Sequence, residues 1–185
     1  MNHVQRVFTA AIATGIALTA ALAPARPVKA ADLIQYSSQR LIEIGVNPTL
    51  AYGVEALGVP VYEGDESFAI CNPSGGFTVY GAYFYNYNAI VMCVNNLPNR
   101  YEFVETFTHE VVHLTQDCRA GLNNGVLETA GGESYIEYLW ERLPEHKQDN
   151  IVRSYDRSDW NVEIEAFYFE TQPEVVKELL INACF

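Results

Sequence analysis

The sequence predicts an α+β fold, a small antiparallel sheet followed by a helical part, and three observations support it. Residues 68–94 are rich in aromatic and β-branched side chains and are interrupted by turn-forming residues. From Tyr101 onward, apolar residues recur at helical spacing over most of the chain. No internal repeat or linker separates the two parts. Strands first and helices afterwards is the order expected of one α+β domain.

Residues 1–30 have the composition of a secretory signal peptide. Arg6 supplies a positive charge, residues 7–23 are apolar, and residues 28–30 form a small-x-small cleavage site. A second possible cleavage site of the same kind lies upstream, at residues 21–23. A membrane anchor is the alternative, but the apolar stretch is short and contains a glycine. We expect a secreted or periplasmic protein, without a stable membrane anchor after cleavage, in which residues 31–185 form a single domain.

Cleavage there would leave 185 − 30 = 155 residues, enough for one domain with a hydrophobic core. The leader carries three basic residues and no acidic ones, so the formal charge falls from −12 to −12 − 3 = −15. A chain this acidic is poorly suited to nucleic acid or to an anionic membrane surface. We therefore expect neither as a partner, and composition leaves the oligomeric state open.

The chain contains four cysteines, all of them in the predicted mature part: Cys71, Cys93, Cys118 and Cys184. An even number of cysteines in an exported chain indicates two disulfides. We favour the pairs Cys71–Cys93, within the strand region, and Cys118–Cys184, between a helix end and the C-terminus. No two cysteines lie close enough in the sequence to form a cysteine-rich zinc site.

The first elements of the mature chain are predicted to be helical. Residues 32–44 form an amphipathic pattern that starts at Asp32 as a cap and ends before Gly45. A second short helix begins at Asn47-Pro48 and ends near Gly58. Residues 61–67 are polar and acidic, and we expect a loop there.

Three strands are then predicted, at residues 68–71, 77–85 and 89–94. Proline, glycine and asparagine between them mark the turns. The strand at 89–94 lies just before the first long helix, so it could form the rim of a cleft. A peptide could then add to an exposed edge there as a further strand.

The remaining chain is predicted to be helical. Asn99 with Glu102 three residues later has the form of a capping box, and no glycine or proline occurs from Tyr101 to Gln116. Further helical stretches follow at 126–142 (broken), 144–155, 161–170 and 173–182.

The first long helix contains the run His109-Glu110-Val111-Val112-His113. Residues four apart lie on one face of a helix, so the two imidazoles can bind one metal ion. The glutamate between them can take a proton from metal-activated water. We expect His109 and His113 as zinc ligands and Glu110 as the general base. A core helix with incidental histidines is the alternative.

A catalytic zinc ion usually has three protein ligands. Glu163 and Glu165 lie in a largely apolar run, where a carboxylate is costly to bury unless it is paired or bound to a metal. Two residues apart on a helix, they point to nearly opposite sides. The small Ala166 lets the two helices approach on the side of Glu163, which favours Glu163 as the third ligand. Glu165 and His146 remain alternatives.

Other residues near the motifs are candidates for supporting roles. Glu170 could accept a hydrogen bond from one histidine, and Gln116 and Asp117 could orient the other, although Asp117 could equally be solvated. The candidates for stabilising an oxyanion are Tyr155, Tyr168 and His146.

The two motifs resemble those of the gluzincin metallopeptidases, particularly their minimal secreted forms. His109, Glu110 and His113 match the H-E-x-x-H motif of that family, and Glu163 with Ala166 matches its later E-x-x-A motif. The gap of 163 − 113 = 50 residues is longer than in many members. The resemblance implies a zincin-like active-site helix in an α+β catalytic domain, one Zn²⁺ per chain and endopeptidase-type chemistry.

The sequence thus predicts an exported zinc-dependent peptidase that acts on a peptide or protein substrate, with Glu110 as its general base. The competing hypothesis is a non-catalytic exported module, stabilised by disulfides, that binds a partner or serves a structural role. An intact Glu110 favours the peptidase, because a purely structural metal site needs no general base.

Overall fold

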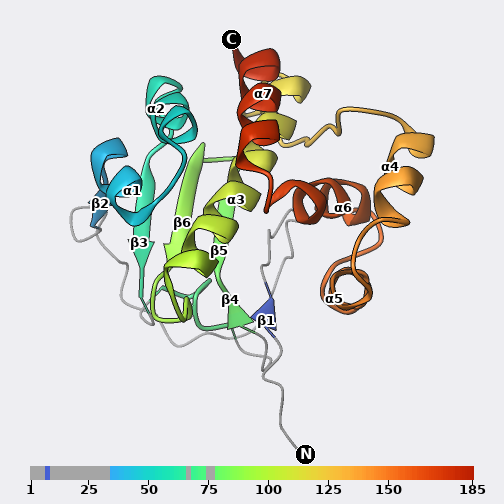
Figure 1. The fold of residues 1–185 in the computed structure, drawn as a ribbon, viewed down its shortest axis with the longest axis horizontal. Helices are drawn as coiled ribbons and strands as arrows, with labels where there is room; N and C mark the ends of the chain where they lie inside the picture. Colours follow the sequence, from blue (N-terminus) through green and yellow to red (C-terminus); the bar gives the residue numbers. More distant parts are fainter. Residues whose placement is uncertain (1–6, 9–33, 66–67, 74–77) are drawn as a thin grey trace, which may run out of the picture.

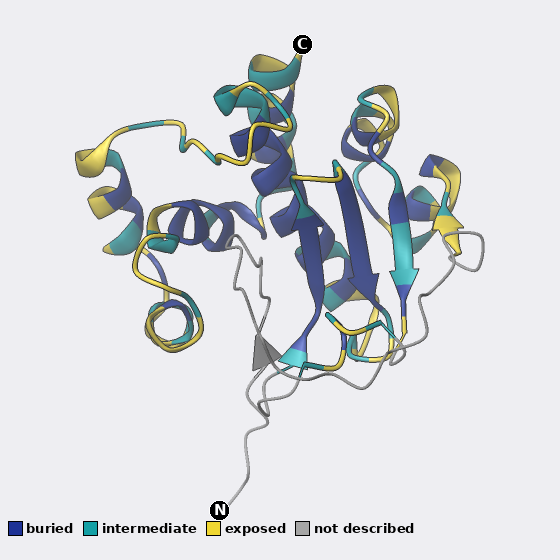
Figure 2. Ribbon diagram, turned by 180° about the vertical axis from the view of Figure 1, so that it is seen from behind, coloured by how far each residue is buried: buried dark blue, intermediate teal, exposed yellow. Residues whose placement is uncertain are grey.

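The structure is a computed structural model that describes residues 7–8, 34–65, 68–73 and 78–185. Within these residues the fold is α+β, as predicted, with a four-stranded sheet in the order β2-β3-β6-β5 and seven helices. Helices lie on one face of the sheet, as the views from the two sides show (Figure 1, Figure 2). None of the described helices is both long and apolar enough to cross a membrane.

The N-terminal part differs from the predicted long helix. Gln35–Tyr36 form strand β2, and helix α1 (Ser38–Ile44) begins only after it. The side chain of Ser37 accepts a hydrogen bond from the Arg40 N–H and so caps the helix there, whereas the predicted cap Asp32 lies outside the described residues. Helix α1 ends at Gly45, in the left-handed conformation, as predicted.

The second predicted helix is confirmed as α2 (Pro48–Ala56), capped by the Asn47 side chain. The loop predicted at 61–67 is wrong, because Val61–Gly64 form strand β3. Tertiary partners explain how so polar a segment becomes a strand. Val61 is buried, and the Glu63 carboxylate accepts a hydrogen bond of 3.1 Å from the Tyr36 hydroxyl on β2.

The sheet is mixed rather than purely antiparallel. Strand β6 (Ala89–Cys93) pairs antiparallel with β5 (Gly81–Phe84) but parallel with β3. The connection from β3 to β6 therefore crosses over, which the sequence pattern did not indicate. Because β6 lies inside the sheet, it cannot supply the exposed edge predicted for residues 89–94, and β5 is the strand at that end.

The predicted strand at 77–85 is present as β4 (Thr78–Val79) and β5. The strand predicted at 68–71 is wrong: this segment is a turn in which the Cys71 N–H donates to the Phe68 carbonyl. Strand β1 (Val7–Phe8) pairs with β4, and the rest of the predicted signal peptide lies outside the described residues.

Helix α3 (Arg100–Ala120) is the longest described helix and lies across β5 and β6 (Figure 1). The Asn99 side chain caps it by accepting a hydrogen bond from the Glu102 N–H, as predicted. It continues beyond the predicted end and stops at Gly121, at φ +105°. The later helices are α4 (Glu133–Trp140), α5 (Glu145–Ser154), α6 (Trp160–Phe169) and α7 (Pro173–Cys184), so only the second half of the stretch predicted at 126–142 is helical.

Both favoured disulfides are confirmed. Cys71–Cys93 joins the turn after β3 to strand β6, and Cys118–Cys184 joins the end of α3 to the end of α7. The main core lies between α3 and the surrounding helices and sheet, and Phe107 of α3 is fully buried in it. Helix α3 is therefore held by packing on several sides, which offsets the modest helix propensity of its β-branched residues.

Candidate metal centre

The face of α3 that carries the sequence motif is completely buried. His109, Glu110 and His113 each have an exposed fraction of 0%. Fully buried groups of this kind need partners, since an unpaired polar side chain in a protein interior costs free energy. The residues around the motif therefore decide what it can do.

Helix α6 brings Glu163, which is also fully buried, opposite the two histidines. The two imidazole Nε2 atoms are 3.2 Å apart. The Glu163 oxygens lie 3.5 Å from them, Oε2 from His109 and Oε1 from His113. Tetrahedral ligands at the usual zinc distances of about 2.0–2.1 Å would be roughly 3.3 Å apart. His109, His113 and Glu163 thus form a buried group that could hold a metal ion.

The hydrogen bonds on the other side of the rings fix which nitrogen faces this group. His109 Nδ1 lies 2.8 Å from a carboxylate oxygen of Glu170, and His113 Nδ1 lies 2.8 Å from Gln116 Oε1. Both partners are acceptors, so each Nδ1 carries the proton and donates it. Two unprotonated Nε2 atoms then face each other beside a carboxylate, an arrangement that a cation would stabilise.

Burial makes this donor set unfavourable without a cation. It lowers the pKa of both His109 and His113 to about 3, so both rings are neutral. Burial, with the nearby Glu110 carboxyl, raises the pKa of Glu163 well above its usual value. Neither Glu163 oxygen makes a hydrogen bond of standard geometry among the described residues. Neutral imidazoles and an orphaned carboxylate fit a bound metal ion.

Glu110 lies close to Glu163, and neither of its oxygens makes a hydrogen bond of standard geometry in the described part of the chain. Burial raises its pKa to about 8, against the effect of the nearby Tyr83 backbone N–H. Strand β5 passes close to it at Gly81, where an added Cβ atom would lie 3.2 Å from Glu110 Oε1. The residue at this position must therefore be small for β5 and Glu110 to approach so closely.

The two alternative third ligands do not join the group. Glu165 is buried on the other side of α6, where it accepts hydrogen bonds from Gln116 and Arg119 of α3. His146 lies at the exposed start of α5. The opposed directions of Glu163 and Glu165 follow from their spacing, as predicted.

Among the predicted oxyanion candidates, Tyr155 is placed best. Its hydroxyl oxygen is buried and makes no hydrogen bond of standard geometry among the described residues. Burial raises its pKa well above the usual value, and the nearby Glu163 and Glu110 carboxyls raise it further. The hydroxyl lies close enough to Glu163 for a weak hydrogen bond, although not at standard geometry. The Tyr168 ring instead packs edge-on against Phe169.

The Asp117 carboxylate is not solvated, and its hydrogen-bond partners are Tyr83 and Asn123 rather than the His113 ring. Asp117 is fully buried, and its carboxylate accepts a hydrogen bond of 2.7 Å from the Tyr83 hydroxyl. Asp117 therefore ties α3 to strand β5. The two other supporting residues predicted from the sequence, Glu170 and Gln116, contact the histidines directly.

Lys147 was not predicted. Its ammonium group forms ion pairs with Glu170 and, at 3.2 Å, with Glu105. These three residues line a cavity of about 340 Å³ together with Phe167, whose ring packs edge-on against His109. Nothing in the polar start of α5 distinguishes Lys147 from other surface lysines, so only the fold identifies it.

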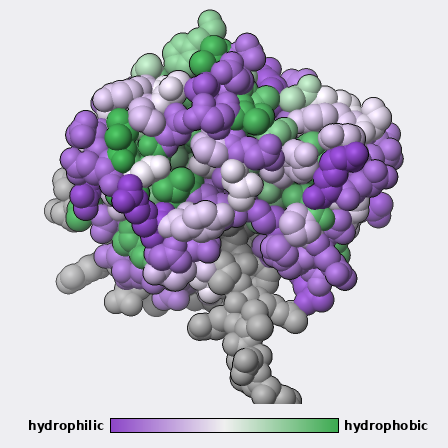
Figure 3. All heavy atoms as spheres, in the orientation of Figure 1, coloured by the Kyte–Doolittle hydropathy of each residue, from purple (hydrophilic) through white to green (hydrophobic). Residues whose placement is uncertain are grey.

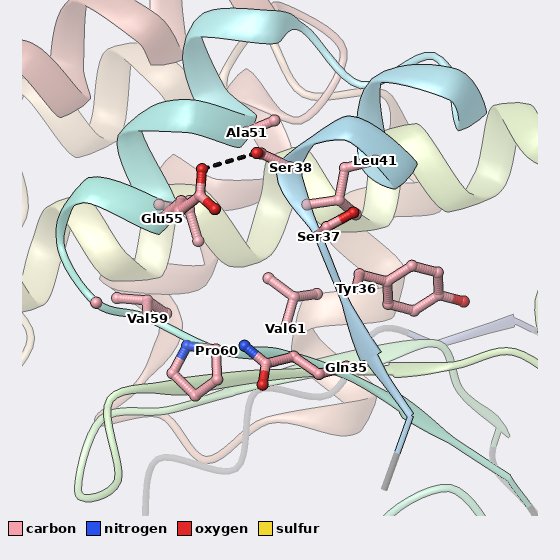
Figure 4. A pocket seen from close by; sticks show the side chains of 12 residues that line it. Gln35, Tyr36, Ser37, Ser38, Leu41, Ala51, Glu55, Val59, Pro60 and Val61 are labelled. Atoms are coloured by element: carbon pink, nitrogen blue, oxygen red, sulfur yellow. Dashed lines mark hydrogen bonds between the residues drawn. The ribbon is translucent and has the colours of Figure 1, made fainter.

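A larger cavity of about 480 Å³ lies away from this centre, between β2, α1, α2 and β3 (Figure 4). Its walls are polar and apolar in about equal parts, and Ser38 donates a hydrogen bond of 2.7 Å to Glu55 there. On the face seen in Figure 3, hydrophilic residues predominate and apolar ones form separate small patches. Neither feature offers a metal-binding group.

Comparisons with protein-family models, with curated proteins and with solved structures found no match for this chain.

Proposed function

We propose that this chain is an exported zinc-dependent peptidase in which His109, His113 and Glu163 hold the metal. Two neutral imidazoles and one carboxylate form the donor set of a catalytic zinc site that leaves a position free. The two disulfides support maturation in an oxidising compartment, in keeping with a secreted or periplasmic location.

The observation that carries the proposal is the position of Glu110. Its carboxyl group is buried close to the metal-binding group, with the Tyr83 backbone N–H as a nearby donor, and a cation bound there would favour its ionised form. A zinc ion bound there would supply Lewis acidity to activate water and polarise a peptide carbonyl. Glu110 accepts the proton of the attacking water and passes it to the leaving amine. The Tyr155 hydroxyl donates to the developing oxyanion.

The cavity of about 340 Å³ that Phe167 and Glu170 line lies on the Nδ1 side of His109, away from the Nε2 atom that faces the metal-binding group. The ligands and Glu110 have no exposed surface, so a peptide gains access only when the surrounding elements separate. Movements of this kind are common in enzymes that close over their substrates.

The complete burial also favours a second candidate, a non-catalytic module with a structural metal ion, because structural sites are closed. The two candidate functions differ in whether they need Glu110. A structural metal site gains nothing from an additional buried carboxyl group beside it, whereas a hydrolytic site requires such a group as its general base.

The test measures zinc per chain and cleavage of an unfolded protein substrate for the purified, disulfide-bonded protein. We expect about one zinc per chain, and Glu110→Gln should retain it while cleavage falls by a factor of about 10² to 10⁴. Glu163→Gln should lose both zinc and cleavage. Glu141→Gln, at a side chain that is 75% exposed, is the matched control and should change neither.

Three results would argue against the proposal. Full cleavage by Glu110→Gln would rule out Glu110 as the general base. A parent protein that binds zinc but cleaves none of a diverse peptide mixture would favour the structural metal site. A parent that takes up no zinc after reloading would rule out the metal centre itself.

A further inference from the structure

A chain of hydrogen bonds leads from the metal-binding group to the other side of α6. His113 Nδ1 donates to Gln116 Oε1 at 2.8 Å. The Gln116 amide nitrogen in turn donates to Glu165 Oε2 and to the Val162 carbonyl, both at 2.9 Å. All three side chains are fully buried, so no solvent competes for these bonds.

These contacts fix the direction of the Gln116 amide. A carboxylate and a backbone carbonyl can only accept hydrogen bonds, so the end of the amide that faces them must be its NH₂ group. The amide oxygen is then left to face His113. If the amide turned over, its oxygen would oppose two acceptors and its NH₂ group would face His113 Nδ1.

The direction of the amide decides which nitrogen of His113 can bind a metal. With the oxygen facing the ring, Nδ1 keeps the proton and Nε2 is free toward His109 and Glu163. With the NH₂ group facing the ring, Nδ1 would have to accept, and the proton would move to Nε2 and block it. We infer that Glu165 is a positioning residue that acts through Gln116 to hold His113 in its metal-binding tautomer.

Glu165 is well held for this role. Its other oxygen accepts hydrogen bonds from the Ala130 N–H at 2.9 Å and the Tyr135 hydroxyl at 3.1 Å. Arg119 pairs with Oε2 at 3.2 Å. Donors from α3, from α4 and from the loop between them thus fix the carboxylate, so it stays in place as an acceptor for Gln116.

The inference rests on the metal centre proposed above, and the test separates the two. Glu165→Gln keeps the size of the side chain but can present an NH₂ group to Gln116, which permits the amide to turn over. We expect zinc affinity, measured by competition with a chelator, to fall about tenfold or more. In the metal-free protein, ¹⁵N NMR should show the Nε2–H tautomer of His113 increase.

The matched control is Tyr135→Phe, which removes a hydrogen bond to Glu165 but leaves the oxygen that faces Gln116. It should change zinc affinity by less than about twofold. A double-mutant cycle completes the test, because Glu165→Gln should have no further effect once Gln116→Ala has removed the amide.

Equal losses of affinity from Glu165→Gln with and without Gln116 would overturn the inference, since Glu165 would then act by another route. So would finding His113 of the metal-free parent mainly in the Nε2–H tautomer, a measurement that needs no variant. A parent that binds no zinc would overturn the proposed function, while the tautomer measurement would still decide the role of Glu165.

Discussion

The two histidines lie four residues apart on one helix, yet different chemistry holds each of them. His109 donates directly to the carboxylate of Glu170, which Lys147 neutralises from the far side. His113 donates to the neutral amide of Gln116, and a carboxylate follows only one step further out. We call the first set, Glu170 with Lys147 and Glu105, the charged arm and the second, Gln116 with Glu165, the amide arm.

The charged arm and the amide arm differ in their exposure to solvent. The charged arm ends at a cavity, where the Lys147 and Glu105 side chains keep exposed fractions of 15% and 18%. The amide arm is fully buried as far as Glu165. A charge beside a ligand is less costly where water is near, whereas a buried amide orients its ring without adding a charge. The charged arm should therefore depend on ion pairing, and the amide arm on geometry.

The largest effect should come from removing the cation of the charged arm. Lys147→Met would leave Glu170 and Glu105 close together without a positive partner. We expect the free energy of unfolding of the metal-free protein to fall by about 3 kcal/mol. This is at the low end of the cost of removing one partner from a buried ion pair, because Lys147 is partly exposed. Urea unfolding measures the change.

Lys177→Met is the matched control, because Lys177 pairs with Glu174 and Glu178 at the surface and its loss should leave stability nearly unchanged. Similar losses in the two lysine variants would contradict the contrast between the arms. Adding Glu170→Gln to Lys147→Met should restore part of the loss, since it removes the unpaired carboxylate.

An intermediate effect is expected from Glu170→Gln alone. An amide is a weaker acceptor than a carboxylate, so His109 becomes a poorer ligand, and zinc affinity should fall about 10- to 100-fold. Chelator competition measures the change, and the exposed Glu178→Gln serves as its control. An unchanged affinity would show that the charged arm stabilises the fold without tuning the metal site.

The smallest expected effect is on how the stability of the protein depends on pH, which tests whether His109 and His113 are both neutral in the folded state. Both histidines have a folded pKa near 3 against 6.5 unfolded, so the metal-free protein loses stability as pH falls from about 6.5 toward 3. Glu110 keeps its proton up to about pH 8 in the folded state against 4.5 unfolded, so stability also falls as pH rises through that range. Glu163, whose pKa burial also raises well above its usual value, adds to the second trend. The effects of the two histidines and of the two carboxyls then nearly cancel between about pH 4.5 and 6.5, where the metal-free protein should be most stable.

Zinc binds only the deprotonated ligands, so the loaded protein should be most stable at higher pH than the metal-free one. Melting temperatures of both forms across this pH range should differ most near pH 8, by about several degrees. A metal-free protein that is most stable at pH 8 would show that the burial of these groups does not govern stability.

The features predicted correctly from the sequence are those with local signals. Asn99 and the absence of glycine and proline after it place α3, and helical spacing puts His109 and His113 on one face. The structure also places Glu163 in one buried group with the two histidines, although its role as a metal ligand stays a prediction. Of the two favoured disulfides, one lies within the predicted strand region and the other joins a predicted helix end to the C-terminus. Both are confirmed.

The errors fall where tertiary contacts decide. The segment at 61–64 becomes a strand because β2 and β6 pair with it on either side, although it runs into the acidic residues from Glu63 to Glu66. The aromatic segment at 68–71 becomes a turn. Lys147 and Glu165 gain their partners from distant elements, which no local pattern encodes.

The disulfide between Cys118 and Cys184 has a consequence for how the metal centre assembles. It joins the chain just after His113 to the end of the helix that follows Glu163, and so roughly halves the shortest covalent path between these two ligands. In the oxidised but unfolded chain, the third ligand is therefore at a higher effective concentration near the first two. If the proposed site binds its metal, disulfide formation would therefore favour binding and would come before it.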